Sequence, residues 1–374
     1  MNERVDRIQC FKDTVAHKKP ERLVLDFGGC PLSTIYGTAK ARLTEFFGYQ
    51  TQSADDGRID ERILKELDID TRSFGRLITP KTKLAKRISD TEYTDDWGMT
   101  YRFAGGHWAI VDNPLRHASI ADLERYPWPD PGNVDMAEIR AIAEEGKRLY
   151  EQNEYVICAE HPVYGVFELG CWMCGFDEFM MRMALDPCFV HRFFSIIWEY
   201  QKHMIDIYYG AVGRYAHFTS SGDDFATQAS MFVSLDYFKE FIMPYFKARI
   251  EHTKTYTDAG FLHHSCGSVY DLIPALAECG VDILNPIQPG AHQMEAAGLK
   301  QAYGGKMVFH GGIDTQRVLP FGTPAEIDAH VREVVSVLGK GGGYILAAAH
   351  NIQEDVPPEN IVAFLQAARK YSYL

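Results

Sequence analysis

Short apolar runs alternate with longer amphipathic segments along most of the chain. Runs of this length are typical of buried strands, and the longer segments repeat apolar residues at the period of a helix. The predicted strands cover residues 22–27, 155–158, 215–219, 260–264, 281–285, 306–310 and 343–347. The predicted helices cover residues 4–16, 40–47, 60–67, 136–152, 178–185, 187–209, 235–258, 269–279, 324–338 and 360–371.

This alternation predicts the fold class. Buried strands separated by helices are typical of a parallel α/β protein. The seven strand candidates come close to the eight of a (β/α)8 barrel. No candidate is followed by the Gly-x-Gly-x-x-Gly turn of a dinucleotide-binding sheet. We therefore predict a (β/α)8 TIM barrel rather than a doubly wound sheet.

The regular alternation begins only near residue 135. Residues 1–135 predict irregular elements, and the alternating, turn-rich stretch from Thr79 to Trp128 predicts a hairpin or flap over the scaffold. The pattern over residues 136–374 predicts regular β/α units. A barrel with insertions accommodates this length, so residues 1–374 are expected to form one barrel domain with N-terminal capping elements.

Polar side chains follow five of the predicted strands at the point where each strand ends. These segments are residues 221–224, 264–266, 285–288, 310–316 and 350–353. Active sites of β/α barrels lie at the carboxyl ends of the strands. The five segments are therefore expected to contribute to one site.

A histidine and a cysteine stand two residues apart, as His264 and Cys266, and a second histidine, His350, follows a later apolar run. At strand ends, three such ligands with one open position are the arrangement of a catalytic zinc site. Zinc held in this way acts as a Lewis acid or activates a bound group. The alternative is that the histidines bond to the backbone and that Cys266 packs in the core.

Four carboxylates are further candidates. Asp223 and Asp224 are adjacent, so one or both reach the cavity as an acid, a base or a substrate contact, or they cap a helix. Asp314 is likewise either a carboxylate that acts on the substrate or one that caps a helix or turn. Glu168 has apolar neighbours and needs a partner there, which makes it a further metal ligand, a base or half of a salt bridge.

Composition excludes some classes of function. A formal net charge of −13 argues against nucleic acid as a partner, and no apolar run is long enough to predict a membrane span. The N-terminus lacks the apolar core of a signal peptide, so the protein is expected to be cytoplasmic with reduced cysteines. The pair Cys171 and Cys174 lies in an apolar helical stretch and is expected to pack in the core.

Several motifs in residues 165–371 carry a family resemblance. They are His264-Ser265-Cys266-Gly267, the strand 280–286, the turn 310–315, the helix start 322–326, and residues 350–352 with 356–361. With these motifs the chain resembles the uroporphyrinogen decarboxylase superfamily, particularly its corrinoid-dependent methyltransferases. The resemblance implies a β/α barrel for the whole chain.

The resemblance also implies a metal site. Methyltransferases of this branch hold zinc with a His-x-Cys pair and a distal cysteine, and exchange a methyl group with cobalamin on a small corrinoid protein. His264 and Cys266 match the pair, whereas His350 stands where the distal cysteine would be. An imidazole in place of a thiolate makes the metal more electrophilic, which favours activation of an oxygen or amine leaving group.

We therefore expect a zinc-dependent methyltransferase that passes a methyl group between a small O- or N-methylated molecule and cob(I)alamin, giving methylcobalamin, on a corrinoid protein. His264, Cys266 and His350 are expected to bind zinc. The expected catalytic residues are Glu168, Asp223 and Asp224, and the expected substrate-binding residues are Gln228, Asn285, Asp314 and Gln316.

Two alternatives stay open. The first is a metal-free decarboxylase of a porphyrinogen-like carboxylate. Such decarboxylases carry an arginine-rich element near the N-terminus, which residues 25–31 lack, although they also place a histidine for substrate contact near the position of His350. The second is a catalytically silent barrel that binds a corrinoid or a small ligand.

Overall fold

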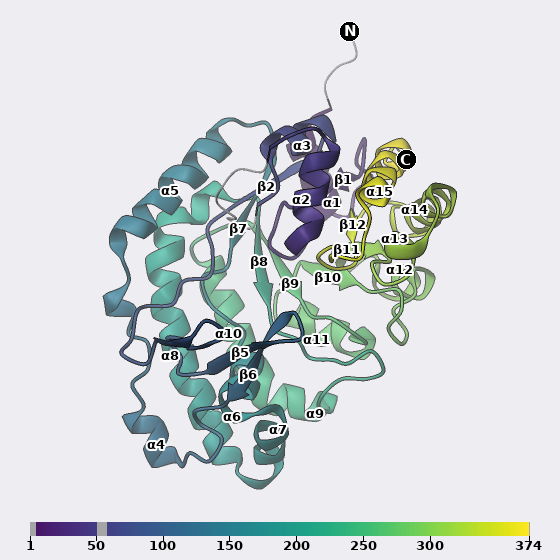
Figure 1. Ribbon diagram of the computed structural model, residues 1–374. Helices are drawn as coiled ribbons and strands as arrows, with labels where there is room; N and C mark the ends of the chain where they lie inside the picture. The colour runs from purple at the N-terminus through teal and green to yellow at the C-terminus, as the bar shows by residue number, and fades with distance from the viewer. Residues whose placement is uncertain (1–4, 51–57, 374) are drawn as a thin grey trace.

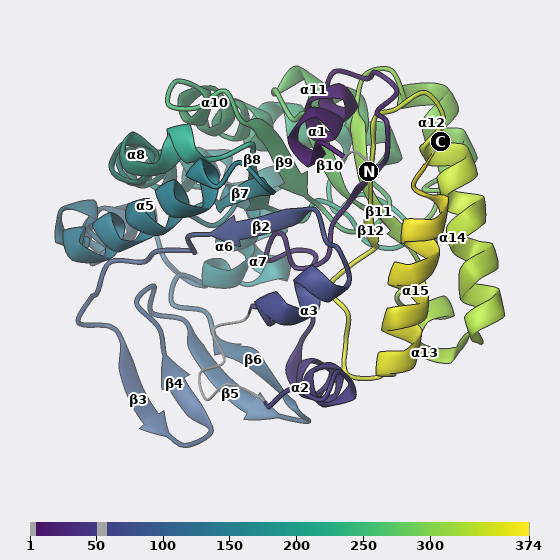
Figure 2. The same cartoon turned by 90° about the horizontal axis from the view of Figure 1, so that it is seen from above.

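The computed structural model describes residues 5–50 and 58–373 and contains a nearly closed barrel of parallel strands. The strands follow one another around the barrel in the order β1-β12-β11-β10-β9-β8-β7-β2. They are β1 (Val24–Leu25), β2 (Thr71–Phe74), β7 (Val156–Glu160), β8 (Phe218–Gly222), β9 (Gly260–His264), β10 (Ile283–Ile287), β11 (Val308–Ile313) and β12 (Tyr344–Ala348). Helices surround this sheet, as Figures 1 and 2 show, so the predicted (β/α)8 TIM barrel is confirmed.

The helices cover most of the predicted helical ranges. They are α1 (Arg7–Val15), α2 (Gly37–Phe46), α3 (Glu61–Glu66), α4 (Ile120–Arg125), α5 (Met136–Glu151), α6 (Val166–Cys174), α7 (Phe176–Leu185), α8 (Pro187–Val212), α9 (Leu235–Tyr237), α10 (Met243–Lys254), α11 (Ile273–Glu278), α12 (Ala296–Tyr303), α13 (Val318–Phe321), α14 (Pro324–Leu338) and α15 (Pro358–Tyr371). Short 3-10 segments are η1 (Pro131–Asn133), η2 (Gly213–Tyr215) and η4 (Tyr270–Leu272), and η3 (Phe238–Ile242) is a π-helix.

Helix α14 illustrates how the sequence sets these elements. Thr323 and Glu326 form a capping box at its start, and Pro324 occupies the first turn, where a missing N–H costs nothing. Ile327, Val331 and other residues of one stripe are buried against the barrel. On α6, Cys171 and Cys174 are buried, which confirms that this pair packs in the core.

Helix α1 closes the amino end of the barrel. Its Cys10 and Phe11 belong to a buried cluster with apolar residues near the amino ends of the strands. Those strand residues are Val24, Val156, Phe218, Leu262, Ile283, Val308 and Ile345. Because packed side chains fill this end of the barrel, chemistry is confined to the carboxyl ends of the strands.

Strands β1 and β2 meet at the seam of the barrel through a buried carboxylate. The N–H of Asp70 donates to the carbonyl of Leu25 at 3.1 Å, and the Leu25 N–H donates to the Asp70 carboxylate at 2.8 Å. Arg22 and Arg7 also donate to this carboxylate, at 2.7 and 3.0 Å. A cluster of charged side chains therefore joins β1 to β2, whereas ladders of backbone hydrogen bonds join the other neighbouring strands.

An antiparallel sheet occupies the region where the sequence predicts a hairpin or flap. It contains β3 (Lys86–Ser89), β4 (Glu92–Thr94), β5 (Thr100–Ala104) and β6 (His107–Asp112) in consecutive order. In Figure 1, β5 and β6 lie over α6, and in Figure 2 the sheet extends away from the barrel. We refer to this sheet as the flap.

Strand β2 is the eighth strand, and the sequence pattern does not predict it. The segment is short and reads Thr-Arg-Ser-Phe, so it has no apolar run to detect. Thr71 and Arg72 are nevertheless buried because they have partners: Arg72 donates to Glu61, and the Thr71 hydroxyl donates to Asp26. Among the described residues, no helix is both long and apolar enough to cross a membrane.

Candidate metal centre

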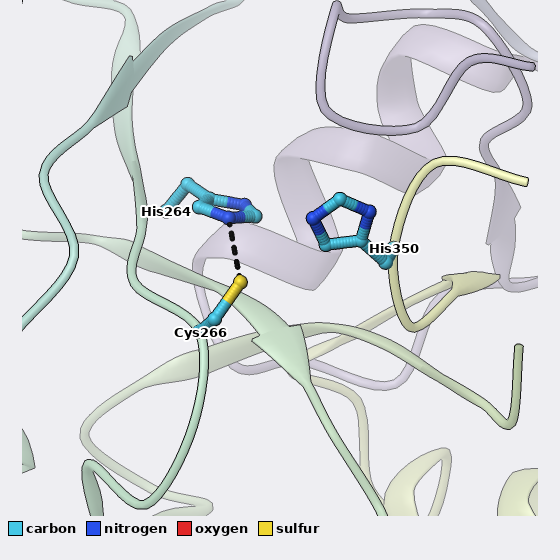
Figure 3. Close-up of side chains that lie close together, drawn as sticks. All are labelled: His264, Cys266 and His350. Carbon is cyan, nitrogen blue, oxygen red and sulfur yellow. Dashed lines mark hydrogen bonds between the residues drawn. The ribbon is translucent and has the colours of Figure 1, made fainter. Parts of the chain in front are cut away.

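The structure brings the three predicted metal-ligating residues together. His264 is the last residue of β9, Cys266 lies in the loop that follows, and His350 lies just after β12. His264 Nε2 is 3.1 Å from Cys266 Sγ, and the ring centroids of His264 and His350 are 5.5 Å apart. One potential ligand atom from each residue lies within 4.8 Å of the others, and Figure 3 shows the three side chains facing a common space.

This donor set fits zinc. Two imidazole nitrogens and one sulfur are ligands that zinc accepts, and tetrahedral ligands at zinc bond lengths lie roughly 3.5 Å apart. Burial lowers the pKa of His264, aided by His350 and opposed by Asp224, so the ring is neutral as a metal ligand must be. Burial also raises the pKa of the Cys266 thiol, together with the charges of Asp224 and Glu168. A bound cation would offset that penalty on the thiolate.

A chain of buried polar groups extends behind His264. The Nδ1 atom of His264 bonds to Oδ1 of Asn285, and the Asn285 Nδ2 atom lies 2.7 Å from Nδ1 of His310. His310 Nε2 lies 2.7 Å from the Asp26 carboxylate. The sheet register explains the contact, since His264 and Asn285 are paired neighbours on β9 and β10.

Asn285 was predicted to bind substrate, and the structure places it behind His264 instead. Its side chain is fully buried, and both polar atoms of its amide face histidine rings. The sequence places His310 in a strand-end segment that is expected to contribute to the site but gives it no role of its own, and it predicts no functional role for Asp26. Each of these two residues stands within or at the end of an apolar run. A polar side chain buried there needs a partner, and this is the signal that the sequence offers.

Asp224 and Glu168 lie beside the three ligand residues. Asp224 Oδ1 accepts the backbone N–H of Cys266 at 2.8 Å and is 3.7 Å from His264 Nε2. Burial, with the charges of Asp223 and Asp224, raises the pKa of Glu168 to about 9. Glu168 is therefore a protonated acid near neutral pH, able to donate a proton.

Asp223 is fully buried and holds the start of α6. Its carboxylate accepts the backbone N–H groups of Phe167 and Glu168 at 3.1 and 2.8 Å. Burial raises the pKa of Asp223 to about 6, although Arg249 and these bonds oppose the increase. Gly165 permits the contact, since a Cβ there would lie 2.1 Å from Asp223 Cγ. Asp223 thus caps the helix that carries Glu168.

The remaining predicted substrate residues lie on loops. Gln228 and Gln316 are exposed. Asp314 is buried, and its carboxylate accepts the backbone N–H groups of Gln316 and Arg317, so it shapes its own turn. Their contact with substrate stays a prediction.

The flap and α6 border an aromatic recess of about 590 Å³. Its lining includes Tyr101 and Trp108 of the flap, Trp172 of α6, and Phe176 at the start of α7. Trp172 follows Glu168 by four residues on α6, so the two side chains lie on the same face of the helix. The recess therefore lies on the side of α6 that carries the acid.

Comparison with solved structures supports the fold. A methyltransferase from Methanosarcina mazei superposes with a TM-score of 0.65 at 15% sequence identity, over 97% of this chain and 98% of that one. At this identity the likeness establishes the common barrel fold.

Sequence comparison places the chain in a family. Uroporphyrinogen decarboxylases from Cronobacter sakazakii and Pseudoalteromonas atlantica are 29% identical over 100 residues and 33% identical over 73 residues. These segments cover 27% and 20% of this chain and the same shares of the two relatives, so the likeness spans about a quarter of their length or less. The model of the family described as Uroporphyrinogen decarboxylase (URO-D) matches residues 93–371. The chain therefore belongs to the uroporphyrinogen decarboxylase family.

Proposed function

We propose that the chain is a zinc-dependent methyltransferase that moves a methyl group from a small O- or N-methylated molecule to a corrinoid protein. The observation that carries this proposal is the convergence of His264, Cys266 and His350 at the carboxyl ends of β9 and β12. Membership of a family of enzymes and a barrel like that of the M. mazei methyltransferase support it.

The residues of the site have different roles in the proposed reaction. Zinc bound by His264, Cys266 and His350 would supply a Lewis acid for the oxygen or nitrogen that leaves the methyl group. Glu168, protonated near neutral pH, donates its proton to a leaving oxygen. Asp224 fixes the backbone at Cys266, and Asp223 fixes the start of α6.

The transfer balances without a further reagent. The bond between the methyl carbon and the oxygen or nitrogen breaks, and the leaving atom keeps the electron pair. A leaving oxygen takes the proton from Glu168, whereas an ammonium nitrogen leaves as the neutral amine and needs none. The methyl carbon forms a bond to cobalt, using the electron pair of cob(I)alamin on the partner protein, which becomes methylcob(III)alamin. The corrinoid is thus a second substrate that the partner supplies.

The aromatic recess indicates the class of methyl donor. Its tyrosine and tryptophan side chains offer flat apolar surfaces beside the face of α6 that carries Glu168. Such surfaces accept a planar ring, and they also attract a methylated ammonium group through its positive charge. We therefore infer a methoxylated aromatic or N-methylated donor.

Metal-free decarboxylation is the second candidate, because the curated relatives bear the name uroporphyrinogen decarboxylase. The negative charges around the site favour decarboxylation less than methyl transfer. Burial, with the nearby charges of Asp223 and Asp224, raises the pKa of Glu168, and those two carboxylates repel a substrate with many carboxylates. A formal net charge of −13 adds to this repulsion.

The proposal is tested by methyl transfer to cob(I)alamin, followed by the absorbance change as methylcobalamin forms. Methoxylated aromatics and methylamines are supplied one at a time to wild-type protein, Cys266→Ala and Cys188→Ala. Cys188 is exposed at the start of α8 and serves as the matched control. We expect transfer by the wild type and the control and loss of transfer in Cys266→Ala.

Two other outcomes would each contradict the proposal. Release of CO2 from a porphyrinogen, unchanged in Cys266→Ala, identifies the metal-free decarboxylase. Tight donor or corrinoid binding with no turnover of any donor identifies a barrel that only binds its ligand.

A further inference from the structure

We propose that Asp26, His310 and Asn285 form a buried relay that fixes the tautomer and orientation of His264, so that its Nε2 atom faces the metal. These three are positioning residues, since they act through His264. The inference rests on the zinc site of the proposed function and deepens it. It adds three residues from β10, β11 and the end of β1 to the account of that site.

The relay is continuous and closed to water. His264 Nδ1 bonds to Asn285, Asn285 bonds to His310 at 2.7 Å, and His310 bonds to Asp26 at 2.7 Å. Asn285 and His310 are fully buried, and the exposed fraction of Asp26 is 1%. Solvent therefore does not compete for these bonds, and each group depends on its neighbour.

With a neutral His310 ring, the groups of the relay allow only one direction of hydrogen bonding. An ionised carboxylate only accepts, so His310 Nε2 must carry the proton that it donates to Asp26. His310 Nδ1 is then bare and accepts the amide N–H of Asn285. This orients Asn285 Oδ1 toward His264, whose Nδ1 must carry a proton.

The proton on His264 Nδ1 determines the state of the other nitrogen of that ring, Nε2. With the proton on Nδ1, the lone pair of His264 Nε2 is free, and this atom is the one that lies 3.1 Å from Cys266 Sγ. A metal requires that bare nitrogen, and a bonded partner on the far side of the ring sets both its direction and its basicity. Asp26 is thus the anchor that sets the proton positions for the whole relay.

The surroundings keep Asp26 ionised. Burial alone would raise the pKa of Asp26, but His310, Thr71 and Ser33 together hold it below its ordinary value. Its second oxygen accepts the hydroxyl of Thr71 and the backbone N–H of Gly29. Both carboxylate oxygens therefore have donors, as the acceptor role requires.

A second metal site is the competing interpretation of this cluster, because ligand atoms of Asp26, Cys30 and His310 also lie within 4.8 Å of one another. Two contacts favour the relay. His310 and Asp26 are at hydrogen-bond distance, and the Cys30 sulfur is 3.4 Å from the Ser33 hydroxyl. All three groups of the cluster are buried, and each has a protein partner there.

The relay is tested with substitutions that keep shape but change polarity. Asp26→Asn can donate to His310 as well as accept, so the relay can reverse and place the proton on His264 Nε2. Asn285→Leu removes both bonds, whereas Asn285→Asp retains an acceptor for His264 Nδ1. We expect zinc affinity to fall about 10- to 100-fold in the first two variants and to recover in Asn285→Asp.

Asp70→Asn is the matched control. Asp70 is as buried as Asp26, at 1% exposure, but its carboxylate bonds to arginines at the barrel seam. Its substitution is expected to lower stability without changing zinc affinity. A parallel loss of zinc affinity in Asp70→Asn would assign the effects to general destabilisation and overturn the proposal.

The second readout is the tautomer of His264 in metal-free protein, measured from imidazole ¹⁵N shifts and assigned by comparison with His264→Gln. We expect a proton on Nδ1 in wild type and a shift toward Nε2 in Asp26→Asn. Because this measurement needs no metal, it tests the relay separately from the proposed zinc site. Wild-type protein without zinc affinity contradicts the proposed function, whereas wild-type affinity and tautomer in Asp26→Asn contradict the relay. Two zinc ions per chain, with one lost in Cys30→Ser, would establish the second metal site instead.

Discussion

Glu168 and Asp223 are neighbouring carboxylic acids whose surroundings give them different roles. Burial and two nearby acids raise the pKa of Glu168 to about 9, so it keeps its proton near neutral pH. Asp223 accepts two backbone N–H groups and faces Arg249, and its pKa is raised only to about 6. The first residue is suited to proton donation and the second to fixing a helix start.

The pH dependence of methyl transfer follows from the state of Glu168. The protonated acid is populated below pH 9 and is lost above it, so the rate should fall about tenfold per pH unit beyond that value. Glu168→Gln should reduce the rate by about 10²- to 10⁴-fold and remove this alkaline decline. The exposed Glu144→Gln on α5 is the control, and an unchanged profile in Glu168→Gln would refute the donor role.

At this scale the sequence predicted that three potential ligand residues converge, but not the chain of buried polar groups behind His264. His264, Cys266 and His350 could be found because each follows an apolar run whose end lies at one rim of a barrel. Asp26 and His310 are 284 residues apart, and the strand order and register bring them into contact. No local pattern contains that information.

At the scale of elements, helix α6 positions the acid, and its start depends on close packing. Gly165 precedes the helix, and Asp223 occupies the space where a Cβ would stand. The sequence predicted β9 with its observed bounds from the apolar pair Phe261 and Leu262, which leads into the His-x-Cys motif. It missed β2, whose polar residues are buried only because distant residues pair with them.

Gly165→Ala tests this packing. The new methyl group would overlap the Asp223 carboxylate, so we expect a loss of about 1 to 3 kcal/mol in the free energy of unfolding and a slower transfer rate. Gly298→Ala in α12 is the matched control, since its Cβ meets nothing within 4 Å and a helix prefers alanine. Urea unfolding of both variants measures the difference. Equal stability of the two variants would contradict the assigned contact.

At the scale of the whole molecule, the barrel closes at one end through α1 and at the seam through Asp70. The charged cluster of Asp70, Arg22 and Arg7 joins β1 to β2 where the ladder of backbone bonds is interrupted. The sequence predicted the barrel from its regular β/α units. It could not predict the seam, because these partners come from segments that show no periodic pattern.

Removal of the seam carboxylate should destabilise the whole barrel. Asp70→Ala leaves the buried Arg22 guanidinium without its carboxylate partner and Arg7 with Asp68 alone, and we expect a loss of about 3 to 5 kcal/mol in the free energy of unfolding. Asp328→Ala breaks an exposed ion pair with Lys370 and should have little effect. Urea denaturation monitored by circular dichroism compares the two, and similar midpoints would contradict the role given to the seam.

The proposed reaction depends on a zinc ion held by His264, Cys266 and His350. Metal analysis of the purified protein, combined with X-ray absorption at the zinc edge, tests it most directly. We expect about one zinc per chain, with one sulfur and two imidazole ligands, and loss of the metal in Cys266→Ala but not in Cys188→Ala. Well-folded protein without zinc, or zinc with no sulfur ligand, would contradict it.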